Sequence, residues 1–186
     1  MTSDLGLRAI ARLVVRFDSF RTPIGNVFVA SSSQGICNVR FDGPDEKDCR
    51  SYLVSQADKV CDDGNALQRA IVELEAYFQG QLSQFTVPID LRSVTDFTRR
   101  VLLATRSIPF GQLKTYGDIA SVIRSPLAAR AVGGALGRNP IPIIVPCHRV
   151  IAHGGKLGGF TGGLTKKRTL LAIEGHMPDE VLRAIE

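Results

Sequence analysis

The sequence lacks the features that mark several protein classes. It contains no tryptophan and only three histidines and four cysteines in 186 residues. No apolar run approaches the ~20 residues that a transmembrane helix requires. Residues 1–17 carry scattered arginines where a secretory signal would have an uninterrupted apolar segment. We therefore expect neither a membrane partner nor export.

The cysteines do not have the spacing of a metal site. Cys37, Cys49 and Cys61 follow one another at intervals of twelve residues, whereas zinc ligands come in closely spaced pairs such as C-x2-C. Because histidines are also few, a Cys/His cage is hard to build, and we expect no metal. The sequence leaves open whether any of these three cysteines is paired in a disulfide.

Acidic residues are scarce in one half of the chain. The formal net charge is +5, but residues 1–93 carry 10 basic and 12 acidic residues, and residues 94–186 carry 13 basic and six acidic residues. Between Asp96 and Ile173 there are 12 basic residues and only two acids. This distribution fits either an ordinary solvated basic face or a surface that binds nucleic acid.

The first half of the chain predicts a small sheet followed by helices. Residues 12–41 have the pattern of β-strands, broken by a turn at residues 22–25. One helix is expected over residues 45–57, and a stronger one begins at Asn65 as N-cap and ends at Gly80. Its apolar residues recur at helical spacing, at Leu67, Ile71, Leu74 and Phe78. We place a domain boundary near Asp90.

The second half predicts a helix-turn-helix. Thr95 is a suitable N-cap for a first helix that stops at residues 109–111. Two short helices follow, over residues 116–123 and 127–137, joined by the turn Ser125-Pro126.

The second helix of this pair is rich in alanine and glycine. Three glycines make it a poor helix by propensity, at a cost of ~1 kcal/mol each. Small residues suit tight packing against another helix, and they also allow the backbone to approach a bulky partner. Arg130 is the one long basic side chain in this helix.

A cysteine and a histidine lie side by side in the next segment. Residues 139–145 form an apolar run that predicts a strand leading into Cys147-His148. A thiol beside an imidazole and basic residues indicates nucleophilic chemistry, because such neighbours lower a cysteine pKa. Neighbours on a strand point to opposite faces, so the two side chains cooperate only if the backbone turns there or a water bridges them. The plainer alternative is a buried thiol and a surface imidazole.

Several motifs of the second half occur together in one known family. The segment at residues 146–150 (PCHRV) resembles the active-site signature of the O6-alkylguanine-DNA alkyltransferases, the methylated-DNA–protein-cysteine methyltransferases. The other motifs follow in family order and at family spacing: residues 115–120 (TYGDIA), 128–133 (AARAVG), 139–140 (NP), 162–164 (GGL) and 170–175 (LLAIEG). The resemblance covers about residues 95–176 strongly, whereas the first half matches in outline, chiefly at residues 22–25.

The resemblance implies an α/β (α+β) fold. Residues 1–90 would form a scaffold domain with a small antiparallel, ribonuclease-H-like sheet and helices. Residues 91–186 would form a mainly helical domain that contains the helix-turn-helix and an active-site strand or loop. This second domain would bind DNA and receive an alkyl group.

The implied activity is direct DNA repair. The protein would bind double-stranded DNA carrying O6-alkylguanine in the minor groove and flip the base out. It would then transfer the alkyl (methyl) group irreversibly to Cys147, with O4-alkylthymine as a further substrate. Each molecule would act once, as a stoichiometric transferase that needs no cofactor. We expect a monomer, cytoplasmic and nucleoid-associated in a prokaryote or nuclear in a eukaryote, and the sequence leaves cooperative binding to DNA open.

The resemblance also implies roles for five residues. Cys147 would be the nucleophile, His148 would take its proton through a water, and Glu174 would orient His148. Asn139 resembles the hinge asparagine that ties the helix-turn-helix to the active-site segment. Tyr116 is similar to the tyrosine that donates a hydrogen bond to guanine N3 as the base leaves.

Further residues match family positions that contact DNA or line the alkylguanine pocket. Arg130 resembles the finger that fills the base stack after flipping, and the small residues of its helix would permit the close approach. The other matching DNA-contact positions are Thr98, Gly117, Ser125, Ala128, Ala129, Ala131, Gly133 and His153. The matching pocket positions are Leu136, Val150, Gly158, Gly159, Phe160 and Thr161. The run at residues 166–168 (KKR) is expected to open a helix that faces DNA.

Three other functions compete with this hypothesis. A lesion-binding relative that transfers nothing would lack the reactive cysteine, which is present here. A helix-turn-helix regulator would need side chains that read bases, and the candidate recognition helix offers almost none. A Cys-His-Glu hydrolase would be revealed by turnover of an ester.

Overall fold

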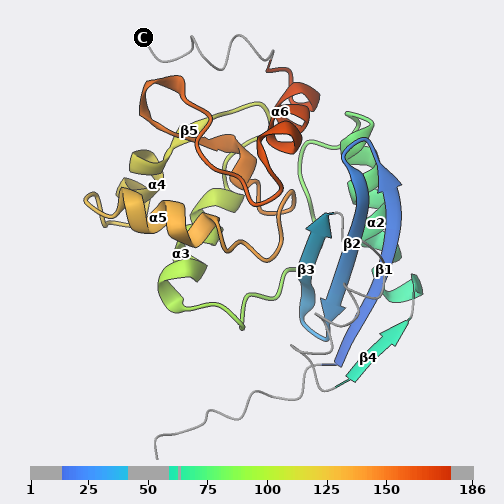
Figure 1. Ribbon diagram of the computed structural model, residues 1–186. Coiled ribbons are helices and arrows are strands. Elements are labelled where there is room, and N and C mark those ends of the chain that lie inside the picture. The colour runs from blue at the N-terminus through green and yellow to red at the C-terminus, as the bar shows by residue number, and fades with distance from the viewer. Residues whose placement is uncertain (1–13, 42–58, 63, 177–186) are drawn as a thin grey trace, which may run out of the picture.

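The computed structural model describes residues 14–41, 59–62 and 64–176 (Figure 1). Its strands are β1 (Val14–Thr22), β2 (Gly25–Ser32), β3 (Gly35–Phe41), β4 (Lys59–Asp62), β5 (Lys114–Thr115) and β6 (Val150–Ile151). Its helices are α2 (Gly64–Phe78), α3 (Asp96–Arg106), α4 (Tyr116–Val122), α5 (Ala129–Leu136) and α6 (Leu164–Ile173), with two short 3-10 turns, η1 (Cys147–Arg149) and η2 (His153–Gly155). None of the helices in these ranges is long and apolar enough to cross a membrane. The helix expected over residues 45–57 lies outside the described residues.

The first half forms a four-stranded sheet in the order β3-β2-β1-β4. β1, β2 and β3 are antiparallel, as predicted, and the Thr22 hydroxyl donates to the Gly25 carbonyl at 2.7 Å in the first turn. β4 pairs in parallel with β1 and was not predicted, because four residues are too few to show an alternating pattern. α2 packs on β1 and β2 (Figure 1) and begins at Gly64, one residue before the predicted cap.

The outer edge of β3 joins the two halves of the chain. The Val39 amide donates to the Pro140 carbonyl of the second half at 2.8 Å. On the same edge, the Ile36 amide donates at 2.8 Å to the carbonyl of Pro88, just before the boundary between the halves. One continuous apolar core runs from α2 through α3 to the segment before Cys147. The halves are therefore packed against each other, and the division into residues 1–90 and 91–186 stays a prediction.

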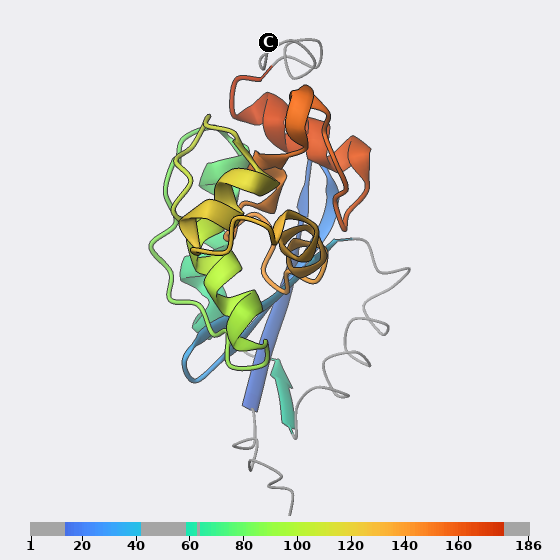
Figure 2. The same cartoon turned by 90° about the vertical axis from the view of Figure 1, so that its left-hand side faces the viewer.

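The second half is mainly helical and stands in front of the sheet in Figure 2. Thr95 caps α3, as predicted, by accepting from the Thr98 amide. α4 carries a capping box in which the Thr115 amide donates to Asp118 Oδ2 at 2.7 Å and the Asp118 amide donates to Thr115 Oγ1 at 3.1 Å. α4 and α5 lie where the helix pair was predicted, and both pack against α3.

Residues 139–145 do not form the predicted strand. They fold as buried turns, with Ile143 at a φ of 73°. Pro140 and Pro142 have no amide hydrogen to give to a ladder. The Asn139 side chain supplies the bonding instead: its Nδ2 donates to the Val145 carbonyl at 2.9 Å, and its Oδ1 accepts from the Ile141 amide at 3.0 Å. The apolar run reflects burial, which a strand and a buried loop share.

Gly35 offers a test of how tightly the edge of the sheet is packed. Its φ is +137°, and a Cβ there would lie 2.5 Å from the Pro88 carbonyl oxygen. We expect Gly35→Ala to lower the free energy of unfolding by about 3 kcal/mol, measured by urea denaturation. Gly80→Ala is the matched control, because Gly80 also has a positive φ but open space around it; its loss should be about 1 kcal/mol. Equal losses would contradict the close approach.

Candidate active site

A buried carboxylate forms the centre of the site. Glu174, just after α6, accepts hydrogen bonds from three side chains and one backbone amide. His148 Nε2 lies 2.7 Å from Oε1, and Tyr77 Oη donates to the same oxygen at 2.8 Å. Arg149 donates to both oxygens, through Nη2 at 2.9 Å and Nε at 2.8 Å, and the Gly111 amide donates to Oε2 at 3.2 Å. The carboxylate is thus surrounded by donors.

These contacts set the protonation states of the pair. Burial alone would raise the pKa of Glu174, but the hydrogen bonds from His148 and Arg149 outweigh it and hold that pKa at about 2. Burial lowers the pKa of His148 below its ordinary value. A carboxylate only accepts, so Nε2 of the neutral imidazole carries the proton. His148 Nδ1 is buried with no hydrogen-bond partner among the described residues, and it is therefore the atom that can take a proton.

Cys147 and His148 lie in the 3-10 turn η1, not on a strand. The backbone turns between them, which is the condition for the two side chains to cooperate. Cys147 is buried, and burial raises the pKa of its thiol; a hydrogen bond from Asn139 and the charge of Lys167 oppose this but do not reverse it. The expectation that neighbours lower this pKa was wrong, because desolvation outweighs them. The resting nucleophile is a neutral thiol.

Cys147 lines a pocket of about 450 Å³. The lining residues are Tyr116, Gly133, Leu136, Gly137, Cys147, Gly159, Phe160 and Thr161. All but Gly137 were predicted as site residues. Gly133 belongs to α5, so the pocket opens beside the helix that carries Arg130.

The Tyr116 hydroxyl is held at this pocket by the loop opposite. Burial raises the pKa of the Tyr116 phenol, and a backbone interaction with Gly159 opposes this without reversing it, so the phenol keeps its hydrogen. Gly158 lies behind the ring, where a Cβ would meet Tyr116 Oη at 2.6 Å. A side chain at position 158 would displace Tyr116, so this part of the pocket wall requires glycine.

Lys167 points into the protein, although the run at residues 166–168 was expected to open a helix that faces DNA. It is fully buried, and its Nζ donates to the Val150 carbonyl at 2.7 Å, to the Leu157 carbonyl and to the Gly159 carbonyl at 3.5 Å. Burial lowers its pKa to about 8. Loop carbonyls that have no ladder partner need a donor, and Lys167 supplies it from the inner side of α6.

The predicted DNA-contact residues divide by exposure. Arg130, Ala131 and His153 are exposed; the partly exposed ones are Gly117, Ser125, Ala128, Ala129 and Gly133. Thr98 is only 6% exposed, and its hydroxyl accepts from Thr95 Oγ1 at 3.0 Å. Its side chain therefore serves the start of α3 and does not reach the surface.

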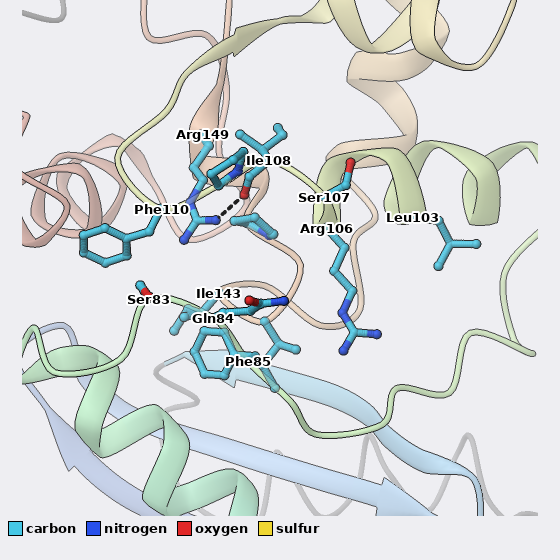
Figure 3. Close-up of a pocket in the computed structure, with 13 residues that line it drawn as sticks. Ser83, Gln84, Phe85, Leu103, Arg106, Ser107, Ile108, Phe110, Ile143 and Arg149 are labelled. Carbon is cyan, nitrogen blue, oxygen red and sulfur yellow. Dashed lines mark hydrogen bonds between the residues drawn. The ribbon is translucent and has the colours of Figure 1, made fainter.

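A larger pocket, of about 570 Å³, has Arg149 among its lining residues (Figure 3). It is lined by both halves of the chain, through residues 83–85 and 106–110 among others, and Cys147 is not part of it. Figure 3 shows Arg149 beside Phe110 with its hydrogen bond to the Ile108 carbonyl. Arg149 therefore joins Glu174 to the α3–β5 connection and does not face the pocket that holds the thiol.

Comparison with known proteins places the chain in a family. Residues 96–176 match the family model described as 6-O-methylguanine DNA methyltransferase, DNA binding domain. Residues 15–91 match the ribonuclease-like domain of the same methyltransferase. The chain belongs to the 6-O-methylguanine DNA methyltransferase family.

Relatives within this methyltransferase family cover most of the chain. The methylated-DNA–protein-cysteine methyltransferase of Mycobacterium tuberculosis is 42% identical over 161 residues, 87% of this chain and 93% of the relative. The methylated-DNA–protein-cysteine methyltransferase of Methanosarcina acetivorans is 41% identical, over 84% of this chain and 96% of the relative. A crystal structure of M. tuberculosis OGT in complex with DNA superposes with a TM-score of 0.74 at 41% identity, covering 86% of this chain and 93% of that one.

Sequence reasoning missed three contributors to the methyltransferase site. Tyr77 continues the apolar stripe of α2 and gave no sign of a polar role. Arg149 was read only as part of the signature, and Lys167 was assigned to the surface. A buried lysine or arginine must find partners, but one sequence does not show which charges are buried.

The buried carboxylate predicts a pH dependence of stability in this methyltransferase-family chain. The folded-state pKa of Glu174, about 2, lies below its unfolded value, so its stabilising effect is present above about pH 4.5 and is lost as the pH falls towards 2. We expect the free energy of unfolding to fall across that window by about 2–3 kcal/mol more in the wild type than in Glu174→Gln. Urea denaturation at pH 6, 4 and 3 measures this. Asp90, whose pKa is also about 2, contributes equally to both proteins, so only their difference reports on Glu174, and parallel curves would contradict the prediction.

Proposed function

We propose that this protein repairs DNA by transferring the methyl group of O6-methylguanine to Cys147. One observation carries the proposal. The pocket-lining thiol of Cys147 adjoins a neutral histidine, His148, whose Nε2 donates to the buried carboxylate of Glu174. The relatives are named for the same transfer. The proposal includes other O6-alkylguanines and O4-alkylthymine as further substrates of the protein.

The transfer is a displacement at the alkyl carbon. The thiol proton passes to His148 Nδ1 through a water, and the sulfur attacks the carbon. The carbon–O6 bond breaks and its electron pair stays on the guanine. The guanine anion takes up a proton from solvent, and the His148 imidazolium returns the thiol proton to solvent, so no net charge remains. Glu174 accepts from Nε2 and stabilises the imidazolium that forms. A thioether is left on Cys147, which no group in the site can reverse, so each molecule acts once and needs no cofactor.

The base must leave the helix to reach the thiol. Cys147 is only 6% exposed at the wall of the pocket, and a stacked base cannot present its O6 substituent to a buried sulfur. Flipping the base out of the helix brings the O6 substituent within reach of the sulfur, at a cost of a few kcal/mol. Arg130, on the exposed face of α5, is suited to fill the space left in the stack, and the small residues around it let α5 approach the minor groove.

The pocket offers donors and acceptors to the flipped base. The Tyr116 phenol donates to guanine N3 and offsets the charge that develops on the leaving base. The Thr161 amide faces O6. The carbonyls of Cys147 and Val150 accept from the exocyclic amine; the Val150 oxygen already accepts from Lys167 Nζ at 2.7 Å and keeps a second lone pair for this bond. Phe160 lies at the pocket wall and limits the alkyl groups that fit.

The same comparisons support a setting for the reaction. The relatives named above come from a bacterium and an archaeon, which supports a cytoplasmic, nucleoid-associated protein. The positive charge of residues 96–173 supports double-stranded DNA as the partner. A monomer is sufficient for the chemistry, because every residue invoked belongs to one chain.

Transfer to Cys147 is testable by mass. After incubation with a duplex containing O6-methylguanine, we expect the peptide that holds Cys147 to gain one CH2 unit, a methyl in place of the thiol hydrogen. Cys147→Ala should abolish the gain and leave the lesion in the DNA. Cys37, also a buried free thiol, is the internal control and should stay unmodified. Intact wild-type protein without a mass gain would overturn the proposed function.

The role of Arg130 is separable from the chemistry. We expect Arg130→Ala to slow methyl transfer from duplex DNA by about tenfold to a hundredfold, because lost stacking and charge cost roughly 1–3 kcal/mol. The reaction with free O6-benzylguanine should be unchanged, because no base is flipped. Arg21→Ala, which removes an exposed arginine from the sheet, is the matched control and should behave as wild type. Equal losses in both reactions of Arg130→Ala would show that Arg130 acts on the pocket.

A further inference from the structure

A tyrosine from the first half of the chain reaches the catalytic pair in the second half. Tyr77 lies in the last turn of α2, and its Oη donates to Glu174 Oε1 at 2.8 Å. The Tyr77 hydroxyl oxygen also lies 3.3 Å from His148 Nε2. Among the described residues of the sheet and α2, Tyr77 is the one that hydrogen-bonds to Glu174 or His148.

The ring of Tyr77 is fixed by the packing around it. The side chain is fully buried. Its ring centroid lies 5.6 Å from that of Phe78, 5.5 Å from Phe85 and 6.2 Å from Phe110. These aromatic neighbours come from α2, from the segment after it and from the segment after α3. The hydroxyl therefore cannot swing away from the carboxylate.

The phenol acts as a donor and not as a base. Burial and the nearby charge of Glu174 raise the pKa of Tyr77 far above its ordinary value, so the hydroxyl keeps its proton. Glu174 Oε1 then accepts from three groups: His148 Nε2, Tyr77 Oη and Arg149 Nη2. Each additional donor withdraws charge from that oxygen and weakens its attraction for the Nε2 hydrogen.

We propose that Tyr77 is a positioning residue for alkyl transfer, which shares Glu174 Oε1 with His148 Nε2 and so sets the basicity of His148. The proposal rests on the function proposed above and deepens it, because it gives the first half of the chain a part in the reaction. With Tyr77 in place, His148 stays neutral at lower pH and its Nδ1 remains available for the thiol proton. Without the phenol, the carboxylate would stabilise the imidazolium more strongly, and a protonated His148 cannot act as a base.

Other charged and titratable groups around His148 come from the second half. They are Glu174, Arg149, Lys167 and the adjacent thiol of Cys147. Glu174 favours the imidazolium, whereas Arg149 and Lys167 disfavour it. None of them is substituted in a Tyr77 variant, so a shift in the titration of His148 would report on the phenol.

The test is the pH–rate profile of Tyr77→Phe. Single-turnover methyl transfer from an O6-methylguanine duplex is measured from pH 5 to pH 9 in both proteins. We expect the acid limb of the variant to move to higher pH by several tenths of a unit to about one unit, which lowers the rate on that limb by up to about tenfold. Thr105→Val is the matched control: it removes a fully buried hydroxyl that bonds to the Val101 carbonyl at 2.8 Å, away from Glu174. Its acid limb should coincide with that of the wild type.

A second substitution distinguishes positioning from a packing defect. 3-Fluorotyrosine, introduced at position 77 alone, keeps the ring and makes the phenol a stronger donor. We expect its acid limb to move to lower pH, opposite to Tyr77→Phe, which loss of stability cannot produce. The role of Tyr77 would be overturned if the acid limbs of both variants coincide with that of the wild type, or if both limbs move in the same direction. Either result would leave the transfer itself intact. Failure of the wild type to take up a methyl group would instead remove the proposed function on which this role depends.

Discussion

The site depends on one buried negative charge. Glu174 is 5% exposed, and a carboxylate taken out of water is strongly destabilising unless it is surrounded by donors. Its donors come from α2, from η1 and from the connection after α3. These segments are far apart in the sequence, so a single charge fixes where they meet. The positions of His148 and Tyr77 follow from the need to satisfy that carboxylate.

The directions of the pKa shifts identify the kind of nucleophile. The pKa of Cys147 is raised and that of His148 is lowered, so the resting pair is a thiol and a neutral imidazole. A preformed thiolate–imidazolium pair would have the opposite shifts. A neutral thiol loses its proton only as it attacks, when His148 is ready to receive it. If each molecule acts once, as proposed, a neutral thiol protects the cysteine from reaction with unrelated electrophiles.

Much of the site could be predicted from the sequence because its motifs are local. Residues 146–150 contain the proposed nucleophile and base, and Thr95 and Thr115 mark helix starts through contacts three residues away. The parts that could not be predicted depend on distant contacts. Tyr77 and Glu174 are 97 residues apart, and Tyr77 has the periodicity of any core aromatic. Lys167 sits in a run of three basic residues, and only the three-dimensional structure shows that the middle one turns inward to the Val150 carbonyl.

The strand predicted before Cys147 was wrong because polar side chains, and not a ladder, satisfy the backbone there. Pro140 and Pro142 have no amide hydrogen to give to a neighbouring strand, and Asn139 donates to the Val145 carbonyl instead. Lys167 does the same for the carbonyls of Leu157 and Gly159, in the loop that reaches the pocket wall at Gly159. Irregular backbone held by a few polar side chains is thus what a backbone-lined pocket requires. In the proposed reaction the thioether stays on Cys147, so such a pocket can also be rigid and buried, because the transferred group needs no exit path.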